Sequence, residues 1–256
     1  MSNIFEISAT RREVVRSLAA LPLASQAVAR GASTVSALAF DAFVLFDPVE
    51  IQRRAAEIAG RDGTALAAAA SSRLFAYTWY YTAASRYVPL DALARDAFAA
   101  TAETMGMRLD WKSLDHVVEG YSQLATWPDA GPALERLRQA GIRLAVLSNL
   151  PEAALRANLD RGGIDRHFEF VLSTDRAKQY KPAPRAYRLG TDAFHLSRAS
   201  IGFAASASWD ASGATWFGYP TAWINRAGTP RDPAHADPAF VSRDMTGVLQ
   251  LAGLSG

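Results

Sequence analysis

The feature that most constrains this chain is a short apolar run that ends in an acid, from Ser36 to Asp41. Apolar residues in succession, without polar alternation, are typical of a strand buried on both faces, as in a parallel sheet. Asp41 then stands at the carboxyl end of the strand, where open α/β sheets bind their ligands. Its carboxylate is therefore a candidate functional group. A second interpretation is that Asp41 only caps the following turn, because aspartate is common in turns.

Similar apolar runs recur along the chain, and segments with helical periodicity separate them. We predict these strands at residues 142–147, 167–172, 200–205, 221–225 and 240–241. Strands that alternate with helices of ten to fifteen residues are typical of a parallel sheet with right-handed crossovers. The chain is therefore predicted to contain a Rossmann-like α/β core.

Residues 49–126 interrupt this alternation because they contain little strand pattern. An aromatic cluster from Phe75 to Tyr80 is expected to pack within this segment or to form an apolar wall over the site. We predict an α-helical cap here, inserted into a parallel-sheet core made of residues 35–48 and 127–250. The predicted fold class is α/β with an inserted helical cap.

Composition excludes several classes of protein. The 256 residues include 27 basic and 25 acidic side chains, without a basic run, which argues against a nucleic-acid partner. There is no cysteine for disulfide or thiolate chemistry. No apolar stretch is long enough for membrane insertion of the mature chain. We expect no metal and no cofactor, since metal-ligand spacing is missing from the four histidines, His116, His167, His195 and His235.

The N-terminal residues differ in character from the rest. Arg11 and Arg12 precede a mildly apolar segment and the small residues Ala27–Val28–Ala29. This order resembles a twin-arginine export signal, which predicts that residues 1–29 are removed and that the mature chain is periplasmic. The alternatives are an N-terminal helix of a cytoplasmic protein or a start codon placed too far upstream.

Four ordered motifs between residues 35 and 250 resemble those of the haloacid dehalogenase superfamily. They are Phe40–Asp41–Ala42–Phe43 followed by Leu45–Phe46–Asp47, then Leu147–Ser148–Asn149, then Tyr180–Lys181–Pro182 with Arg185 and Tyr187, and Trp209–Asp210–Ala211–Ser212–Gly213. The first motif is similar to that of the L-2-haloacid dehalogenase (type II) branch. The resemblance implies a haloacid dehalogenase fold with a helical cap.

The resemblance also implies a reaction. Asp41 would be a nucleophile that converts short (S)-2-haloacids to (R)-2-hydroxy acids through an ester. Lys181 would keep Asp41 ionised by lowering its pKa. Asp210 would balance Lys181 and place the hydrolytic water. Alternatively, Lys181 is a solvated surface residue and Asp210 caps a helix.

Four further residues are implied as neighbours of the substrate. Ser148 and Asn149 end a predicted strand and could orient the substrate carboxylate or the carbonyl of the Asp41 ester, so the resemblance implies a catalytic role for Ser148 and a substrate-binding role for Asn149. Asn149 could instead cap the helix that begins at Pro151. Tyr187 and Trp209 would flank the site, although the Tyr187 ring could merely pack.

Several positions depart from the family pattern. Phe43 stands where phosphatases of the superfamily have a second aspartate, which argues against phosphoryl transfer. Ser71 stands where the family has an arginine that binds the substrate carboxylate, and a hydroxyl cannot make a bidentate ion pair. Arg73 is close in sequence but is expected to point elsewhere. Ala205 and Ala207 replace a polar pair of the family.

Because these family residues are missing, functions other than dehalogenation of a haloacid substrate stay open. The chain could be a weakened enzyme, a non-catalytic binding protein of the same fold, or, less in keeping with Phe43, a phosphatase. A homodimer formed through the cap is a further expectation.

Overall fold

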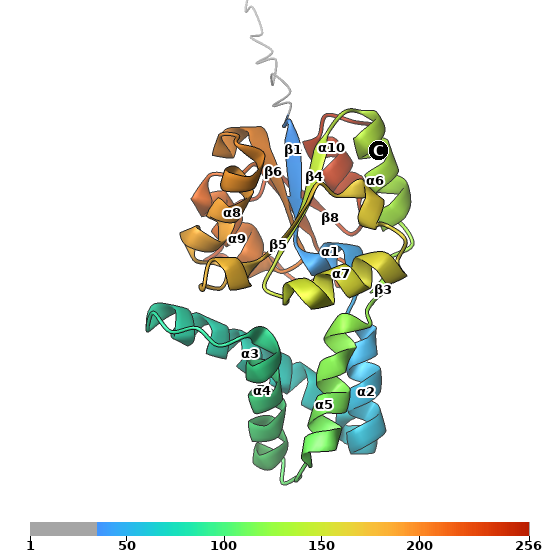
Figure 1. Ribbon diagram of the computed structural model, residues 1–256, viewed down its shortest axis with the longest axis vertical. Helices are drawn as coiled ribbons and strands as arrows, with labels where there is room; N and C mark the ends of the chain where they lie inside the picture. Colours follow the sequence, from blue (N-terminus) through green and yellow to red (C-terminus); the bar gives the residue numbers. More distant parts are fainter. Residues whose placement is uncertain (1–34, 256) are drawn as a thin grey trace, which may run out of the picture. The chain divides into compact units, whose positions relative to one another are not determined.

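The computed structural model describes residues 35–255 (Figure 1). The predicted export segment, residues 1–29, lies outside the described residues. Within residues 35–255, six strands form one sheet in the order β5-β4-β1-β6-β7-β8, with every neighbouring pair parallel. The strands are β1 (Ala37–Phe40), β4 (Arg143–Ser148), β5 (Phe170–Ser173), β6 (Ile201–Ala205), β7 (Thr221–Ile224) and β8 (Phe240–Ser242). The predicted α/β fold is confirmed.

One strand begins later than predicted. β5 starts at Phe170 rather than at His167, because residues Asp165–His167 form a 3₁₀ turn. The edge strand expected at residues 240–241 is present as β8.

Helices cover both faces of the sheet (Figure 1). In β1, Ala37 and Ala39 belong to one apolar cluster, whereas Leu38 and Phe40 belong to another. The first cluster includes α8 (Pro184–Phe194) and α9 (Ser208–Phe217), and the second includes α6 (Ala130–Gln139), α7 (Glu152–Arg161) and α10 (Thr246–Leu251). Because successive side chains of a strand point to opposite faces, the continuous apolar run of β1 serves both layers.

A helical insertion lies between two short strands. The strands, β2 (Phe46–Asp47) and β3 (Ala125–Thr126), pair antiparallel. The chain segment that leads into the insertion therefore runs beside the segment that leads out of it. The insertion contains α2 (Val49–Ala59), α3 (Gly63–Ala83), α4 (Leu90–Thr104) and α5 (Trp111–Glu119). Its status as a domain bounded at residues 49 and 126 stays a prediction, because the described residues form one compact unit. None of the described helices has the length and apolarity needed to cross a membrane.

Candidate active site

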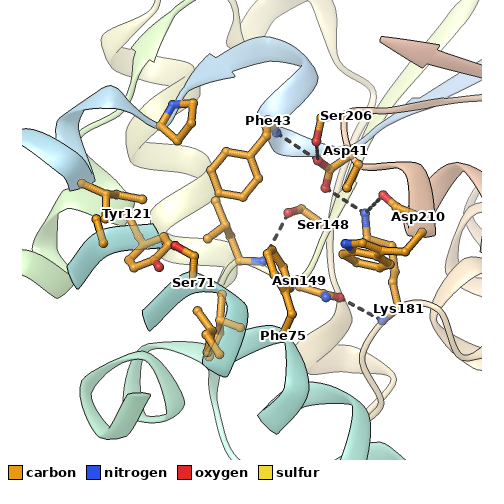
Figure 2. Close-up of a pocket in the computed structure, with 18 of the residues that line it drawn as sticks. Asp41, Phe43, Ser71, Phe75, Tyr121, Ser148, Asn149, Lys181, Ser206 and Asp210 are labelled. Atoms are coloured by element: carbon orange, nitrogen blue, oxygen red, sulfur yellow. Dashed lines mark hydrogen bonds and ion pairs between the residues drawn. The ribbon is translucent and has the colours of Figure 1, made fainter. Parts of the chain in front are cut away.

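A cavity of about 380 Å³ lies at the carboxyl ends of β1, β4 and β6 and is closed on another side by α3. Figure 2 shows the residues that line it. The lining of this cavity includes seven residues with a predicted role in catalysis or substrate binding: Asp41, Ser71, Ser148, Asn149, Lys181, Trp209 and Asp210. The strand ends therefore bring together groups that are widely separated in the sequence, as expected at this edge of a parallel sheet.

Asp41 is both a helix cap and a member of the site. It precedes α1 (Ala42–Leu45), and its Oδ2 accepts a hydrogen bond of 3.1 Å from the Phe43 amide. The same oxygen accepts a hydrogen bond of 2.8 Å from the Ser206 hydroxyl. The other oxygen, Oδ1, lies 2.8 Å from the Lys181 ammonium. Asp41 thus caps the following turn and also lines the cavity, and its role as a functional group stays a prediction.

Lys181 is buried rather than solvated at the surface. Its Nζ donates to Asp41 Oδ1 at 2.8 Å, to Asp210 Oδ2 at 2.7 Å and to the Leu147 carbonyl at 3.2 Å. An ammonium has three N–H donors, so these contacts use all of them. Burial favours the neutral amine, but the carboxylates of Asp210 and Asp41 outweigh it and raise the pKa of Lys181. Lys181 is therefore a cation held between two acids.

Asp210 lies in the first turn of α9, whose N-cap is Ala207, so the interpretation of Asp210 as an N-cap is wrong. The side chain is buried. Burial raises the pKa of Asp210 to about 6, the Asp41 charge acts in the same direction, and Lys181 opposes both. Asp210 is thus a carboxylate that remains largely ionised at pH 7 and gains a proton in mild acid.

Tyr187 lies behind Asp210 and does not line the cavity. Its hydroxyl donates to Asp210 Oδ1 at 2.6 Å, and its ring packs among the buried residues of α8, α9 and the sheet. Direct contact with substrate, implied for Tyr187 by the resemblance, is therefore a wrong expectation. Its position supports the orientation of Asp210 instead.

Ser148 and Asn149 present neutral donors. Asn149 Oδ1 accepts from the Lys181 amide at 3.0 Å and from Thr174 Oγ1 at 3.2 Å. Because these donors occupy the oxygen, the amino group of Asn149 is the part that can donate to a ligand. Ser148 Oγ accepts from the Leu150 amide at 3.3 Å, which leaves its proton to donate.

The alternative role of Asn149 as a helix cap is wrong. The N-cap of α7 is Pro151, with no side-chain cap bond. The polar group of Asn149 is directed to Lys181 and Thr174 instead.

Ser206 is a site residue that was not predicted from the sequence. The prediction noted that Ala205 and Ala207 lack polar side chains, but the hydroxyl that reaches Asp41 belongs to the residue between them. The available signal was its place, because Ser206 directly follows the strand that pairs with β1. Which of three consecutive residues turns toward Asp41 depends on the backbone after the strand.

The α3 wall is mostly apolar. Ser71 lines the cavity with Leu74 and Phe75. Arg73 donates instead to Thr101 Oγ1 at 3.0 Å, so the expectation that it points elsewhere is confirmed. The Phe75 ring lies 5.3 Å from that of Trp209, and together they cover part of the cavity.

The aromatic cluster on α3 divides between two environments. Phe75 lines the cavity, but Trp79 and Tyr80 are 41% and 52% exposed. Only part of the cluster therefore forms the predicted wall.

Comparisons with known proteins show the family of this chain. The haloacid dehalogenase-like hydrolase family matches residues 18–218. Over 218 residues the chain is 31% identical to the (S)-2-haloacid dehalogenase of Pseudomonas sp. (strain YL), covering 85% of this chain and 94% of that protein. It is 37% identical over 175 residues to haloacetate dehalogenase H-2 of Moraxella sp. (strain B), covering 68% and 78%.

A solved L-2-haloacid dehalogenase superposes with a TM-score of 0.82 at 33% identity, covering 86% of this chain and 99% of that one. The agreement extends over nearly all of the described residues. The chain therefore belongs to the haloacid dehalogenase-like hydrolase family.

Proposed function

We propose that this chain is a 2-haloacid dehalogenase in which Asp41 displaces the halide and forms an ester. The observation that carries the proposal is the arrangement of Asp41, Lys181 and Asp210 at the base of a largely apolar cavity. A carboxylate that is ionised, partly dry and close to an electrophilic carbon is a nucleophile. The two relatives, an (S)-2-haloacid dehalogenase and a haloacetate dehalogenase, support haloacids as the substrate class.

In the first step an Asp41 oxygen attacks C2 of the haloacid. The new carbon–oxygen bond forms as the carbon–halogen bond breaks, and the halide leaves with the electron pair. A halide leaves without a proton, so this step does not need the second aspartate that Phe43 replaces. A phosphatase would need that acid, and a phenyl ring cannot supply a proton. Attack from the side opposite the halogen inverts C2, which turns an (S)-haloacid into an (R)-hydroxy acid.

In the second step water attacks the Asp41 carbonyl carbon. The bond from this carbon to the substrate oxygen breaks, the hydroxy acid leaves with an oxygen that came from Asp41, and the carboxylate is restored. Asp210 is the carboxylate in reach that can accept the water proton and return it to the leaving alkoxide oxygen. The Phe43 amide and the Ser206 hydroxyl both donate to Oδ2, an arrangement that stabilises the oxyanion of this step.

The substrate carboxylate is assigned to Ser148 and Asn149. The Ser148 proton and the Asn149 amino group are neutral donors at the end of β4. They lie on the same side of the cavity as Asp41 (Figure 2).

The test is halide release from 2-chloropropionate and chloroacetate in the presence of a chelator. We expect turnover, and a single turnover in ¹⁸O-water should yield unlabelled hydroxy acid because its new oxygen comes from Asp41. Labelled product would contradict the ester. Turnover of p-nitrophenyl phosphate that requires Mg²⁺, without halide release, would favour a phosphatase, and inactivity of the folded protein in both assays would favour a binding protein.

We further propose export through the twin-arginine route to the periplasm. The order of Arg11–Arg12, an apolar segment and Ala27–Val28–Ala29 supports it. Mass spectrometry of the protein from its native host should find a chain that begins at Arg30. An intact N-terminus on a cytoplasmic protein would contradict the proposal.

A homodimer formed through the helical insertion is also proposed. The exposed rings of Trp79 and Tyr80 on α3 support it, because grouped exposed aromatic side chains are typical of contact surfaces. Light scattering should give about twice the chain mass of 27.6 kDa. Trp79→Ser should shift the measured mass toward the monomer.

A further inference from the structure

The cavity has an apolar side that the proposed reaction does not use. Ala68, Ser71 and Phe75 lie three and four residues apart on α3 and so share one helix face. Ile51 and Leu90 add apolar surface from other parts of the insertion. The polar groups on this side are neutral and belong to Gln52, Ser71 and Tyr121.

The distribution of charge decides which part of a haloacid this side can receive. Among the described residues that line the cavity, Lys181 is the only cation, and its three donors are used. With Asp41 and Asp210 ionised, two carboxylates and one ammonium leave one net negative charge. A substrate carboxylate directed toward α3 would point away from Lys181, whereas Ser148 and Asn149 adjoin this cation, whose backbone amide donates to Asn149 and whose Nζ donates to the Leu147 carbonyl. The substrate carboxylate belongs with Ser148 and Asn149, and the apolar side is left for the substituent on C2.

The size of the cavity exceeds what a short acid needs. Its volume of about 380 Å³ falls within the range of ~300–1,000 Å³ typical of sites for drug-sized ligands. A three-carbon haloacid would leave water against the apolar wall. Burying an alkyl chain there removes apolar surface from water, which strengthens binding by about fourfold for each methylene.

Tyr121 and Leu90 mark where such a chain must end. A second cavity of about 400 Å³ shares only these two residues with the first, so together they separate the two spaces. Both side chains are at most 8% exposed. Figure 2 shows Tyr121 beside Ser71, on the side of the cavity away from Lys181.

We infer that the site prefers 2-haloacids with a long alkyl substituent on C2, and that Tyr121 limits the length of this substituent. The inference rests on the proposed dehalogenase function and names the substrate class within it. The carboxylate binds the neutral donors at the end of β4, C2 faces Asp41, and the alkyl chain runs along α3 toward Tyr121.

The first experiment measures kcat/KM for bromide release from 2-bromopropionate, 2-bromobutyrate, 2-bromohexanoate and 2-bromooctanoate. We expect a rise of about fourfold for each methylene until the chain reaches Tyr121. A kcat/KM that stays constant or falls as the alkyl chain lengthens would overturn this inference, but it would leave the proposed dehalogenase function intact. No bromide release from any of the four acids would overturn both.

The second experiment changes the length of the apolar side. Ala68 is exposed on α3 and lines the cavity, and leucine is a strong helix former, so Ala68→Leu should fold. We expect the ratio of kcat/KM for 2-bromooctanoate to that for 2-bromopropionate to fall at least tenfold. Ala69→Leu is the matched control, because Ala69 is exposed but does not line the cavity, and its ratio should match the parent. An equal ratio in both variants would overturn the inference.

A third variant addresses the boundary. Tyr121→Ala should join the two cavities and move the preferred chain to a greater length, whereas Tyr121→Phe should keep the parent preference. A folded Tyr121→Ala protein with unchanged preference would refute the role of Tyr121. Should that variant unfold, the comparison of Ala68→Leu with Ala69→Leu still decides the inference.

Discussion

The two sides of the cavity are built on different physical principles. At the strand ends, Asp41, Lys181 and Asp210 form a buried network in which each charged group has a partner at 2.8 Å or less. On the α3 side the lining is apolar, and its polar groups are neutral. The comparison indicates that the strand ends carry the reaction, whereas the insertion selects the substrate.

The two sides also differ in their tolerance of change. Removing one member of a buried ion network leaves a charge without its partner, which is costly. A change in an apolar wall alters volume and contact area, with smaller effects. Selectivity can therefore vary on α3 without disturbing the nucleophile.

The largest effect is expected for the nucleophile. Asp41→Asn should reduce halide release by about 10⁴-fold or more, since an amide is a poor nucleophile and most of the rate enhancement depends on it. The control is Asp47→Asn, which keeps the hydrogen bond to the Val49 amide and should retain activity. Steady-state bromide release measures both. Comparable turnover by Asp41→Asn, free of contaminating enzyme, would refute the assignment.

The next effect is on the network itself. Lys181→Met should abolish turnover and lower the free energy of unfolding by about 3–5 kcal/mol, because Asp41 and Asp210 are left without their cation. Denaturant unfolding measures the loss. Adding Asp210→Asn to this variant should restore part of the stability, because one uncompensated charge is removed. Equal stability of parent and Lys181→Met would show that the ion network contributes nothing.

The titration of Asp210 should change activity and stability in opposite directions as pH rises. Its raised pKa of about 6 means that the folded protein binds this proton more tightly than the unfolded chain. Stability from this group therefore falls as pH rises from about 4 to about 6. Activity should rise over the same acidic range and lose about tenfold for each pH unit below 6, because the carboxylate is the base. Asp210→Asn should remove the stability trend, and an unchanged trend would exclude Asp210 as its source.

Ser206→Ala should have a moderate effect. A hydrogen bond to a charged group contributes about 1.5–3 kcal/mol, so turnover should fall about 10- to 100-fold. The Asp41 ester should then accumulate, because the lost donor stabilises the oxyanion that forms during ester hydrolysis. Intact-protein mass spectrometry would detect the ester. Ser206→Thr keeps the hydroxyl and should remain close to the parent. Equal rates for the alanine and threonine variants would argue against the bond.

The smallest effect is expected on the α3 side. Ser71→Arg should leave KM for 2-chloropropionate close to the parent value, because the substrate carboxylate is assigned to Ser148 and Asn149 at the strand ends and not to α3. Ser72→Arg, exposed on the same helix, is the control and should change neither KM nor kcat. A folded Ser71→Arg protein whose KM falls about tenfold would place the carboxylate at α3 and contradict that assignment.

Much of the charged side was predictable because it depends on where the strands end. Asp41, Ser148 and Asp210 were assigned from motifs that follow predicted strands, and the carboxyl ends of parallel strands meet at one edge. That rule holds whatever the exact packing. Lys181 does not follow from that rule, because its place near Asp41, 140 residues away in the chain, was implied only by the resemblance of Tyr180–Lys181–Pro182 to a family motif.

By itself the sequence determined the α/β class, the apolar strand that ends in Asp41, and the absence of an arginine at Ser71. Only the tertiary structure decided that Ser206 contacts Asp41, that Tyr187 lies behind Asp210, and that Tyr121 bounds the cavity. The positions of the strands along the chain follow from hydrophobic periodicity, which a sequence displays directly. Side-chain direction instead depends on backbone geometry at strand ends and on packing between distant segments, and neither is written in a local pattern.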